Sequence, residues 1–138
     1  MPAPISLLLR LSSVSEPLKI EEVELSSPQE REVLVQIKAA GLCHSDLSTV
    51  NGNRPRQTPM VLGHEAAGIV MECGSGVTDL SQGDHVVLVF APSCGECISC
   101  IEGHPGRCEP GQKANADGTL LGGGIRLSQN GKKVYHHV

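Results

Sequence analysis

Residues 94–108 read CGECISCIEGHPGRC, a stretch that places four cysteines within fifteen residues in the pattern C-x2-C-x2-C-x7-C. Zinc prefers four thiolate ligands at about 2.3 Å, and a Cys-x-x-Cys turn holds two sulfurs on one side of a tight loop. Segment 91–111 also contains four glycines and three prolines, which predicts irregular chain instead of a helix or strand. A loop of about 15 residues is uncommon in a domain unless something organises it. We therefore predict a structural zinc lobe over residues 91–111, with the ligands Cys94, Cys97, Cys100 and Cys108.

The composition describes one small domain with an aliphatic core. At 138 residues the chain fits the single-domain range, so we expect one domain over residues 1–138. Phe90 and Tyr135 are the only aromatic residues, so aliphatic side chains must fill the interior. A formal charge of −4 and a pI near 5.8 argue against nucleic acid or an anionic membrane as a partner. No apolar run approaches the roughly 20 residues that a membrane-spanning helix needs.

The cysteine content also indicates a compartment. Six cysteines could form three disulfides, but disulfide-stapled secreted domains are usually shorter than about 80 residues and follow an export signal. The short apolar run 5–9 has no basic residue before it and is interrupted by Arg10, so we expect no signal peptide. Cys-x-x-Cys spacing outside that context is typical of metal binding in a reducing compartment, and we expect a cytoplasmic protein.

Outside the lobe, the hydrophobic pattern predicts β structure. Valine-rich or alternating runs at residues 32–38, 61–70 and 84–90 predict strands bounded by glycines. The pair Asn130-Gly131 predicts a hairpin over residues 127–134, because it suits the positive φ angles of a type I′ turn. A short helix is expected over residues 45–50, where a capping side chain comes first and Asn-Gly follows the end. Short strands joined by glycine turns indicate an all-β, barrel-like domain.

Two other segments carry a second set of metal-ligand types. Cys43 begins the run Cys-His-Ser-Asp, and His64 and Glu65 follow Gly63 about twenty residues later. Thiolate, imidazole and carboxylate from separate loops are the ligand types of a catalytic zinc, which keeps one coordination position open for water or substrate. Taken singly, each is weak evidence, since a lone cysteine is usually a small buried residue.

Together, these motifs closely resemble the zinc-containing medium-chain alcohol dehydrogenases. Residues 63–77, GHEAAGIVMECGSGV, match that family's G-H-E-x2-G-x5-G-x2-V signature, and residues 41–46, 83–86 and the four-cysteine stretch lie in its order and spacing. The resemblance covers roughly residues 18–138. It implies the GroES-like catalytic domain, a mainly β fold with a partly open barrel, a structural zinc lobe and few short helices. It also implies that the chain is an N-terminal, C-terminally truncated part of an enzyme whose Rossmann coenzyme domain lies elsewhere.

The resemblance assigns roles around a catalytic zinc. Cys43 and His64 correspond to two of three protein ligands, and Glu65 to a nearby acid that can approach the metal when the site rearranges. Asp46 corresponds to the carboxylate that orients the ligating histidine. Ser45 corresponds to the hydroxyl that hydrogen-bonds the substrate oxygen and starts proton release. The third ligand lies downstream in the family, so we expect weaker metal binding here than at the four cysteines.

Three further positions concern the coenzyme and the substrate. His44 corresponds to a position that contacts the coenzyme pyrophosphate. Phe90 corresponds to a wall of the substrate pocket, although a core aromatic is an equal alternative. Ser48 is a departure, since many family members have a proton-relay histidine at that place.

The implied activity is the oxidation of an alcohol to an aldehyde or ketone, with hydride transfer to NAD or NADP in the full-length enzyme. It implies one structural and one catalytic zinc, a small-molecule alcohol or aldehyde as substrate, and a homo-oligomer for the full-length enzyme. Residues 1–138 contain no strand–glycine turn–helix unit for a dinucleotide, so we expect the chain alone to be inactive. We also expect an unpaired barrel edge near Tyr135.

Two other classes share part of these features. A ferredoxin-like iron–sulfur electron-transfer protein also has C-x2-C-x2-C, but the bacterial run continues with x3-C-P. Here Cys108 follows after seven residues and precedes Glu109, which disfavours that class. A non-catalytic, zinc-stabilised binding module remains an alternative for the isolated chain.

Overall fold

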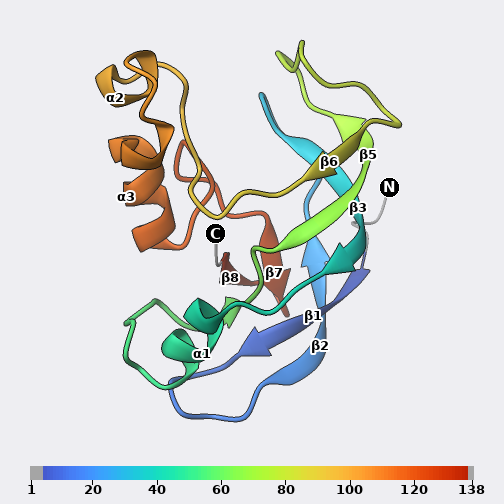
Figure 1. Cartoon of the computed structure of the whole chain (residues 1–138). Coiled ribbons are helices and arrows are strands. Elements are labelled where there is room, and N and C mark those ends of the chain that lie inside the picture. Colours follow the sequence, from blue (N-terminus) through green and yellow to red (C-terminus); the bar gives the residue numbers. More distant parts are fainter. Residues whose placement is uncertain (1–4, 137–138) are drawn as a thin grey trace.

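The structure, a computed structural model, describes residues 5–136, so residues 1–4 and 137–138 of the predicted domain lie outside it (Figure 1). The strands are β1 (Ile5–Leu11), β2 (Lys19–Leu25), β3 (Val33–Ala40), β4 (Met60–Val61), β5 (Ala66–Cys73), β6 (His85–Val87), β7 (Leu127–Gln129) and β8 (Lys132–His136). The helices are α1 (His44–Val50), α2 (Ile98–Ile101) and α3 (Glu109–Asp117), with a 3-10 turn η1 (Pro105–Arg107). This confirms a mainly β fold with few short helices. No helix among the described residues is long and apolar enough to cross a membrane.

Five strands form a closed barrel in the order β1-β2-β7-β8-β4. The two-residue strand β4 closes it, because it pairs antiparallel with the end of β1 and parallel with β8. In the parallel pair, Met60 lies opposite Tyr135. The prediction of an unpaired barrel edge near Tyr135 is therefore wrong, since β8 has β7 on one side and β4 on the other.

The buried side chains of the barrel strands are aliphatic, as the composition predicts. They form two clusters, the first of Leu11, Met60 and Leu62 and the second of Val23, Val61, Leu127 and Val134, which lie on opposite faces of β4 because Met60 and Val61 are consecutive on that strand. Tyr135 is only partly buried and packs against the first cluster. Fully burying one such aliphatic side chain stabilises a fold by about 1.5–3 kcal/mol. Strand β4 contributes to both clusters, so the loop that follows it starts from a firmly held point.

Strands β3, β5 and β6 form a separate antiparallel sheet in the order β3-β5-β6. The pairing of β3 with β5 requires a glycine at position 68, since a Cβ there would lie 2.4 Å from the carbonyl oxygen of Gln36. One end of β3 leads into α1, and β5 begins directly after residues 62–65. The sheet thereby brings together the two segments that carry Cys43 and His64.

Two local predictions are confirmed. The hairpin of β7 and β8 turns at Asn130 and Gly131, whose φ angles are 52° and 73°. Helix α1 occupies the predicted position and begins one residue earlier, at His44, with Cys43 as its N-cap.

Two strand predictions are wrong in extent. Residues 61–70 do not form one strand, because β4 ends at Val61 and β5 begins at Ala66. Gly63 interrupts the run with a φ of 114°, a value that favours glycine. Residues 84–90 form a strand only over His85–Val87. In both cases the interruption releases the segment that carries a predicted site residue from the sheet.

The prediction that residues 91–111 are irregular is also wrong, because this lobe contains α2, η1 and the start of α3. Pro105 and Pro110 occupy the first turns of η1 and α3, where the missing N–H of proline would have no helical partner. Gly118 ends α3 with a φ of 69°. The prolines and glycines of the lobe thus lie at helix ends, and Figure 1 shows the resulting helices grouped on one side of the molecule.

Candidate metal centres

The four cysteines of the lobe converge as predicted. The Sγ atoms of Cys94, Cys97, Cys100 and Cys108 all lie within 4.8 Å of one another. Cys97 and Cys108 are the N-cap residues of α2 and α3, so the helix starts hold two of the sulfurs in place. All six cysteines of the chain are free thiols, which excludes the arrangement of three disulfides.

Backbone N–H groups of the lobe donate hydrogen bonds to two of these sulfurs. The Sγ of Cys94 accepts from Glu96 and Cys97 at 3.4 and 3.3 Å, and these bonds lower the pKa of Cys94 to about 7. The Sγ of Cys108 accepts from Cys94 and Gly111 at 3.2 and 3.3 Å. Burial instead raises the pKa of Cys100 to about 11.

The donor set of the lobe fits zinc. N–H···S hydrogen bonds to Cys94 and Cys108 favour the thiolate form that the metal needs, and the four converging sulfurs can complete a tetrahedron. Position 111 must be glycine for this packing, because a Cβ there would lie 1.8 Å from the carbonyl oxygen of Pro92.

The second group of predicted ligands also converges. One ligand atom from each of Cys43, His64 and Glu65 lies within 4.8 Å of the other two. The two segments are tied by a 2.7 Å hydrogen bond from the Gly41 N–H to the carbonyl oxygen of Glu65. A side chain at position 41 would collide with Glu65, since a Cβ would lie 2.7 Å from its Oε2 atom. This mixed set fits a zinc ion that keeps a position open.

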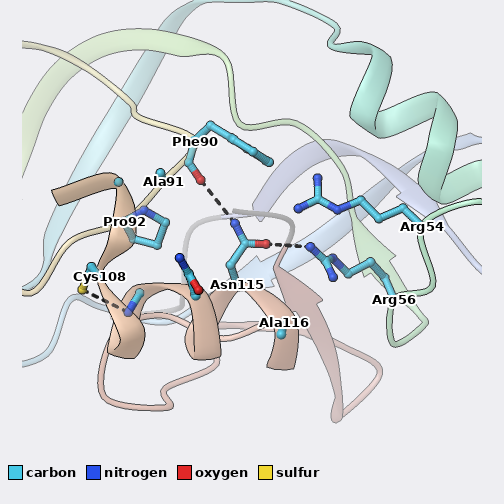
Figure 2. A pocket seen from close by; sticks show the side chains of 11 residues that line it. Arg54, Arg56, Phe90, Ala91, Pro92, Cys108, Asn115 and Ala116 are labelled. Atoms are coloured by element: carbon cyan, nitrogen blue, oxygen red, sulfur yellow. Dashed lines mark hydrogen bonds between the residues drawn. The ribbon is translucent and has the colours of Figure 1, made fainter. Parts of the chain in front are cut away.

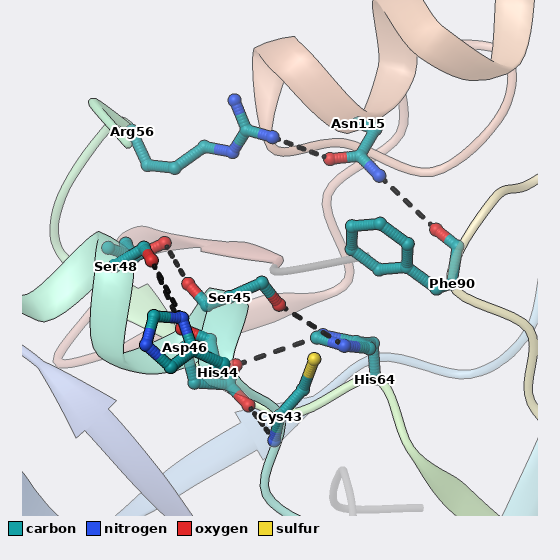
Figure 3. Close-up of polar contacts among 10 residues, drawn as sticks. Cys43, His44, Ser45, Asp46, Ser48, Arg56, His64, Phe90 and Asn115 are labelled. Atoms are coloured by element: carbon teal, nitrogen blue, oxygen red, sulfur yellow. Dashed lines mark hydrogen bonds and ion pairs between the residues drawn. The ribbon is translucent and has the colours of Figure 1, made fainter. Parts of the chain in front are cut away.

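Asp46 connects the two segments behind this centre (Figure 3). Its Oδ2 accepts a 3.0 Å hydrogen bond from the Cys43 N–H, and its Oδ1 lies 3.8 Å from Nδ1 of His64. Asp46 and His64 are only 5% and 3% exposed. Ser45 Oγ lies 3.4 Å from Nε2 of His64, on the other side of the ring. The centre thus has a buried carboxylate behind the imidazole and a hydroxyl in front of it.

The remaining predicted residues lie around this centre. His44 is exposed, and its Nδ1 lies 3.4 Å from Oγ of Ser48. The Phe90 ring centroid lies 4.4 Å from that of His64, with a tilt of 48° between the rings. Phe90 is 39% exposed and lines a pocket, so the pocket-wall alternative describes it better than the core alternative.

Sequence reasoning missed the other side chains of this pocket, which has a volume of about 260 Å³ (Figure 2). The guanidinium carbon of Arg54 lies 5.0 Å from the centre of the Phe90 ring. Arg56 donates a 2.9 Å hydrogen bond to Oδ1 of Asn115, whose Nδ2 donates to the carbonyl oxygen of Phe90 at 3.3 Å. Arg56 and Asn115 are 59 positions apart, and no local pattern joins them.

Comparison with known proteins identifies the family. The model of the alcohol dehydrogenase GroES-like domain matches residues 29–134. S-(hydroxymethyl)glutathione dehydrogenase of Synechocystis is 41% identical over 126 residues, which are 91% of this chain and 34% of that protein. The chain therefore spans about a third of the length of the curated relatives it matches.

Solved structures agree with this result. Benzyl alcohol dehydrogenase from Acinetobacter calcoaceticus superposes with a TM-score of 0.85 and 34% identity, covering 96% of this chain and 35% of that one. CAD from Helicobacter pylori, complexed with NADP(H), gives a TM-score of 0.68 and 33% identity, covering 80% and 32% of the two chains. The fold, the family match and these relatives together show that the chain belongs to the alcohol dehydrogenase family and has its GroES-like fold.

Proposed function

We propose that residues 1–138 are the zinc-binding catalytic domain of an NAD(P)-dependent alcohol dehydrogenase, which oxidises an alcohol to an aldehyde or ketone. The observation that carries the proposal is the convergence of Cys43, His64 and Glu65 within 4.8 Å beside the hydroxyl of Ser45. The activities named for the relatives, on S-(hydroxymethyl)glutathione and on benzyl alcohol, support it.

The contrast between the two centres supports a division of roles. Four thiols close the coordination sphere of the lobe, whereas three mixed donors leave room for an exogenous oxygen ligand. When bound at such a site, zinc lowers the pKa of an alcohol or water oxygen towards neutrality. We therefore assign the structural zinc to Cys94, Cys97, Cys100 and Cys108, and the catalytic zinc to Cys43 and His64 with Glu65 nearby.

The side chains around the mixed centre have distinct tasks in this proposal. Asp46 orients His64 and favours a proton on Nδ1, so that Nε2 faces the metal. Ser45 accepts the proton of the alcohol and, being only half-buried, releases it towards solvent. Phe90 covers the face of His64 and excludes water from one side of the reacting carbon.

The coenzyme is NAD or NADP, held by a Rossmann domain that the described residues do not include. The NADP(H) complex of the Helicobacter pylori relative supports this choice of coenzyme. His44 is exposed at the start of α1 and offers a contact for the coenzyme pyrophosphate. Residues 1–138 alone should not catalyse turnover, because hydride transfer needs the nicotinamide within about 3–3.5 Å of the alcohol carbon.

The partners follow from the same proposal. The substrate is a small-molecule alcohol or aldehyde, and the full-length enzyme is a homo-oligomer. The net charge of −4 supports the absence of a nucleic-acid or membrane partner, and the free thiols support a cytoplasmic location. The family match favours this enzyme over the iron–sulfur alternative.

Cobalt substitution tests the proposal directly. Two Co²⁺ ions per chain should bind, and added benzyl alcohol should change the absorption bands of only one of them. Cys43→Ala should remove the alcohol-sensitive bands, whereas Cys97→Ala should remove the insensitive ones. A cobalt spectrum that no alcohol changes would contradict the proposal and favour the zinc-stabilised binding module.

A further inference from the structure

The pocket next to the mixed centre is built from three separate parts of the chain. Arg54 and Arg56 come from the segment between α1 and β4, residues 90–92 from the segment after β6, and Asn115 from α3 (Figure 2). Phe90 belongs to the pocket wall and also contacts His64, since the ring centroids are 4.4 Å apart. The Phe90 ring therefore lies between a molecule bound in this pocket and the candidate ligand His64.

The two pocket arginines form no ion pair among the described residues. Arg10, Arg31 and Arg126 each form an ion pair with a glutamate, whereas Arg107, outside the pocket lining, also has none. Among the described residues, neither Arg54 nor Arg56 has a carboxylate within ion-pair distance. Their side chains instead contact neutral groups, the Phe90 ring and the Asn115 amide oxygen. The pocket thus holds two neighbouring positive charges that the described part of the chain does not neutralise.

One donor of Arg56 lacks a partner in this environment. Its Nε is buried without a hydrogen bond among the described residues. Buried polar atoms are normally satisfied, and although Nε of Arg10 is also unsatisfied, Arg10 has an ion pair and lies outside the pocket lining, whereas Arg56 combines an unsatisfied donor with an unneutralised charge in a pocket. Burial and the nearby charge of Arg54 also lower the pKa of Arg56, as expected for an uncompensated guanidinium.

We propose that Arg54 and Arg56 bind the carboxylate of the substrate, so that the enzyme prefers alcohols or aldehydes with an anionic group at the far end. The inference rests on the proposed function, because it places the carbon to be oxidised at the Cys43/His64 centre. A guanidinium fork matches a carboxylate with two parallel hydrogen bonds. Phe90, Ala91 and Ala116 provide apolar wall for the body of the substrate.

The pyrophosphate of the coenzyme is another oxyanion that two arginines could bind. We assign the arginines to the substrate because the hydrogen-bonded chain from Arg56 through Asn115 reaches Phe90, the residue that covers His64 (Figure 3). The candidate coenzyme residue His44 has a different neighbour, Ser48.

NMR titration of the zinc-loaded 138-residue chain tests this assignment without turnover. Benzyl alcohol and 4-(hydroxymethyl)benzoate differ only by the carboxylate, and ADP-ribose represents the coenzyme. The benzoate should bind about 10- to 100-fold more tightly than benzyl alcohol, the range expected for charge-assisted hydrogen bonds. Arg56→Gln and Arg54→Gln should each remove most of this difference, so that the ratio of the two affinities approaches one in each variant.

Arg31→Gln is the matched control, because it removes one guanidinium whose charge Glu96 already neutralises. Arg31→Gln should retain the full preference for the benzoate over benzyl alcohol. Arg56→Lys keeps the positive charge but loses the guanidinium fork, so this variant should retain only part of that preference. If Arg56→Gln disturbs folding, Arg54→Gln decides the question, since the one side-chain contact described for Arg54 is with the Phe90 ring and no hydrogen bond of this side chain is lost.

The outcomes separate the two proposals. Equal affinity for both alcohols, or an unchanged preference in both Gln variants, overturns the carboxylate assignment while signals near His64 still respond to alcohol. Loss of ADP-ribose binding alone in these variants assigns the arginines to the coenzyme and also overturns it. If neither alcohol shifts the signals of Cys43 and His64, the proposed function itself fails.

Discussion

The lobe and the mixed centre solve the same problem, the convergence of metal ligands, in opposite ways. The lobe takes all four sulfurs from residues 94–108 and completes its ligand set locally. The mixed centre takes Cys43 from the start of α1 and His64 and Glu65 from the loop after β4. Local ligands can be brought together by the metal itself, whereas distant ligands meet only after the sheet and barrel have formed.

Packing around the two centres shows the same contrast. The lobe buries little apolar surface, and Ile98 and Ile101 remain 75% and 74% exposed. The mixed centre lies against a buried framework that includes Asp46, Thr49 and Leu62. We infer that the lobe depends on its ion for folding, and that the mixed centre is shaped by the protein before any ion binds.

The largest effect should follow from removing a lobe ligand. Cys108→Ser should release the structural zinc and unfold the lobe, because binding energies of order 10 kcal/mol couple such a site to folding. Hydrogen exchange should show lost amide protection over residues 94–118, with the barrel strands still protected. Retained protection in the lobe would show that packing holds it without the metal.

The second largest effect should follow from removing the Ser45 hydroxyl, which lies in front of His64, and it concerns the rate of turnover. In a protein that joins this chain to a coenzyme domain, as the proposed function requires, Ser45→Ala should slow alcohol oxidation by about 10²–10⁴-fold if the hydroxyl transfers the proton. Zinc content and melting temperature should stay unchanged. Ser93→Ala, at an exposed position outside the centre, is the control. A loss of stability equal to the loss of rate would make Ser45 a structural residue.

A smaller effect should follow from altering the carboxylate behind the imidazole. Asp46→Asn should weaken metal binding at the mixed centre by about 10- to 100-fold and leave the lobe zinc in place. Zinc titration against a competing chelator should show the weaker second site in this variant, and mild chelation followed by elemental analysis should leave one zinc per chain in both proteins. Two chelator-resistant ions in the parent would contradict the expected difference between the centres.

The smallest effect should be a pH dependence of stability, and it concerns His136 on β8, in the barrel and outside both candidate metal centres. Burial, together with the charge of Arg126, lowers the pKa of His136 to about 4, and its Nε2 accepts a 3.0 Å hydrogen bond from the Arg126 N–H. As the pH falls, His136 therefore becomes protonated in the unfolded chain before it does so in the folded protein. The contribution of neutral His136 to the free energy of unfolding is therefore complete above about pH 6.5 and is lost as the pH falls towards 4.

Glu32 also stabilises the folded protein, and its contribution to the free energy of unfolding likewise decreases as the pH falls, but over a lower pH range. Partial burial acts to raise its pKa, but hydrogen bonds from Arg126 and Gln29 outweigh burial and hold the pKa of Glu32 below its ordinary range. Its contribution is therefore lost only as the pH falls below that range. Urea unfolding of the metal-free chain at pH 7 and 5 should show the loss, and His136→Gln should reduce it. His104→Gln in the lobe serves as the control, and an unchanged pH dependence in His136→Gln would refute the assignment.

The sequence predicts those parts of the molecule that short-range patterns determine. Cysteine spacing predicts the lobe cluster, and Asn130-Gly131 predicts the last hairpin. The prolines and glycines of the lobe predict irregular chain, but the structure places Pro110 and Gly111 in the first turn of α3, where Gly111 packs against Pro92. Such a role depends on tertiary contact, which composition does not show.

The parts that the sequence does not predict join distant residues. Met60 pairs with Tyr135 in the strand contact that closes the barrel, and Arg56 reaches Asn115 across the pocket. Neither pair has a spacing rule, because each depends on how two elements pack. For the mixed centre the ligand types alone are weak evidence, because Cys43 and His64 belong to separate segments, and the prediction depends on resemblance to a family.

Barrel closure has a consequence for the order of events during synthesis. The ribosome completes the four lobe cysteines at residue 108, before it adds β7 and β8. Strand β4 can pair with β1 as soon as both are made, but the parallel pairing with β8 that closes the barrel waits until residues 132–136 leave the exit tunnel. A nascent chain therefore completes the ligand set of the lobe before the barrel seam next to the mixed centre can form.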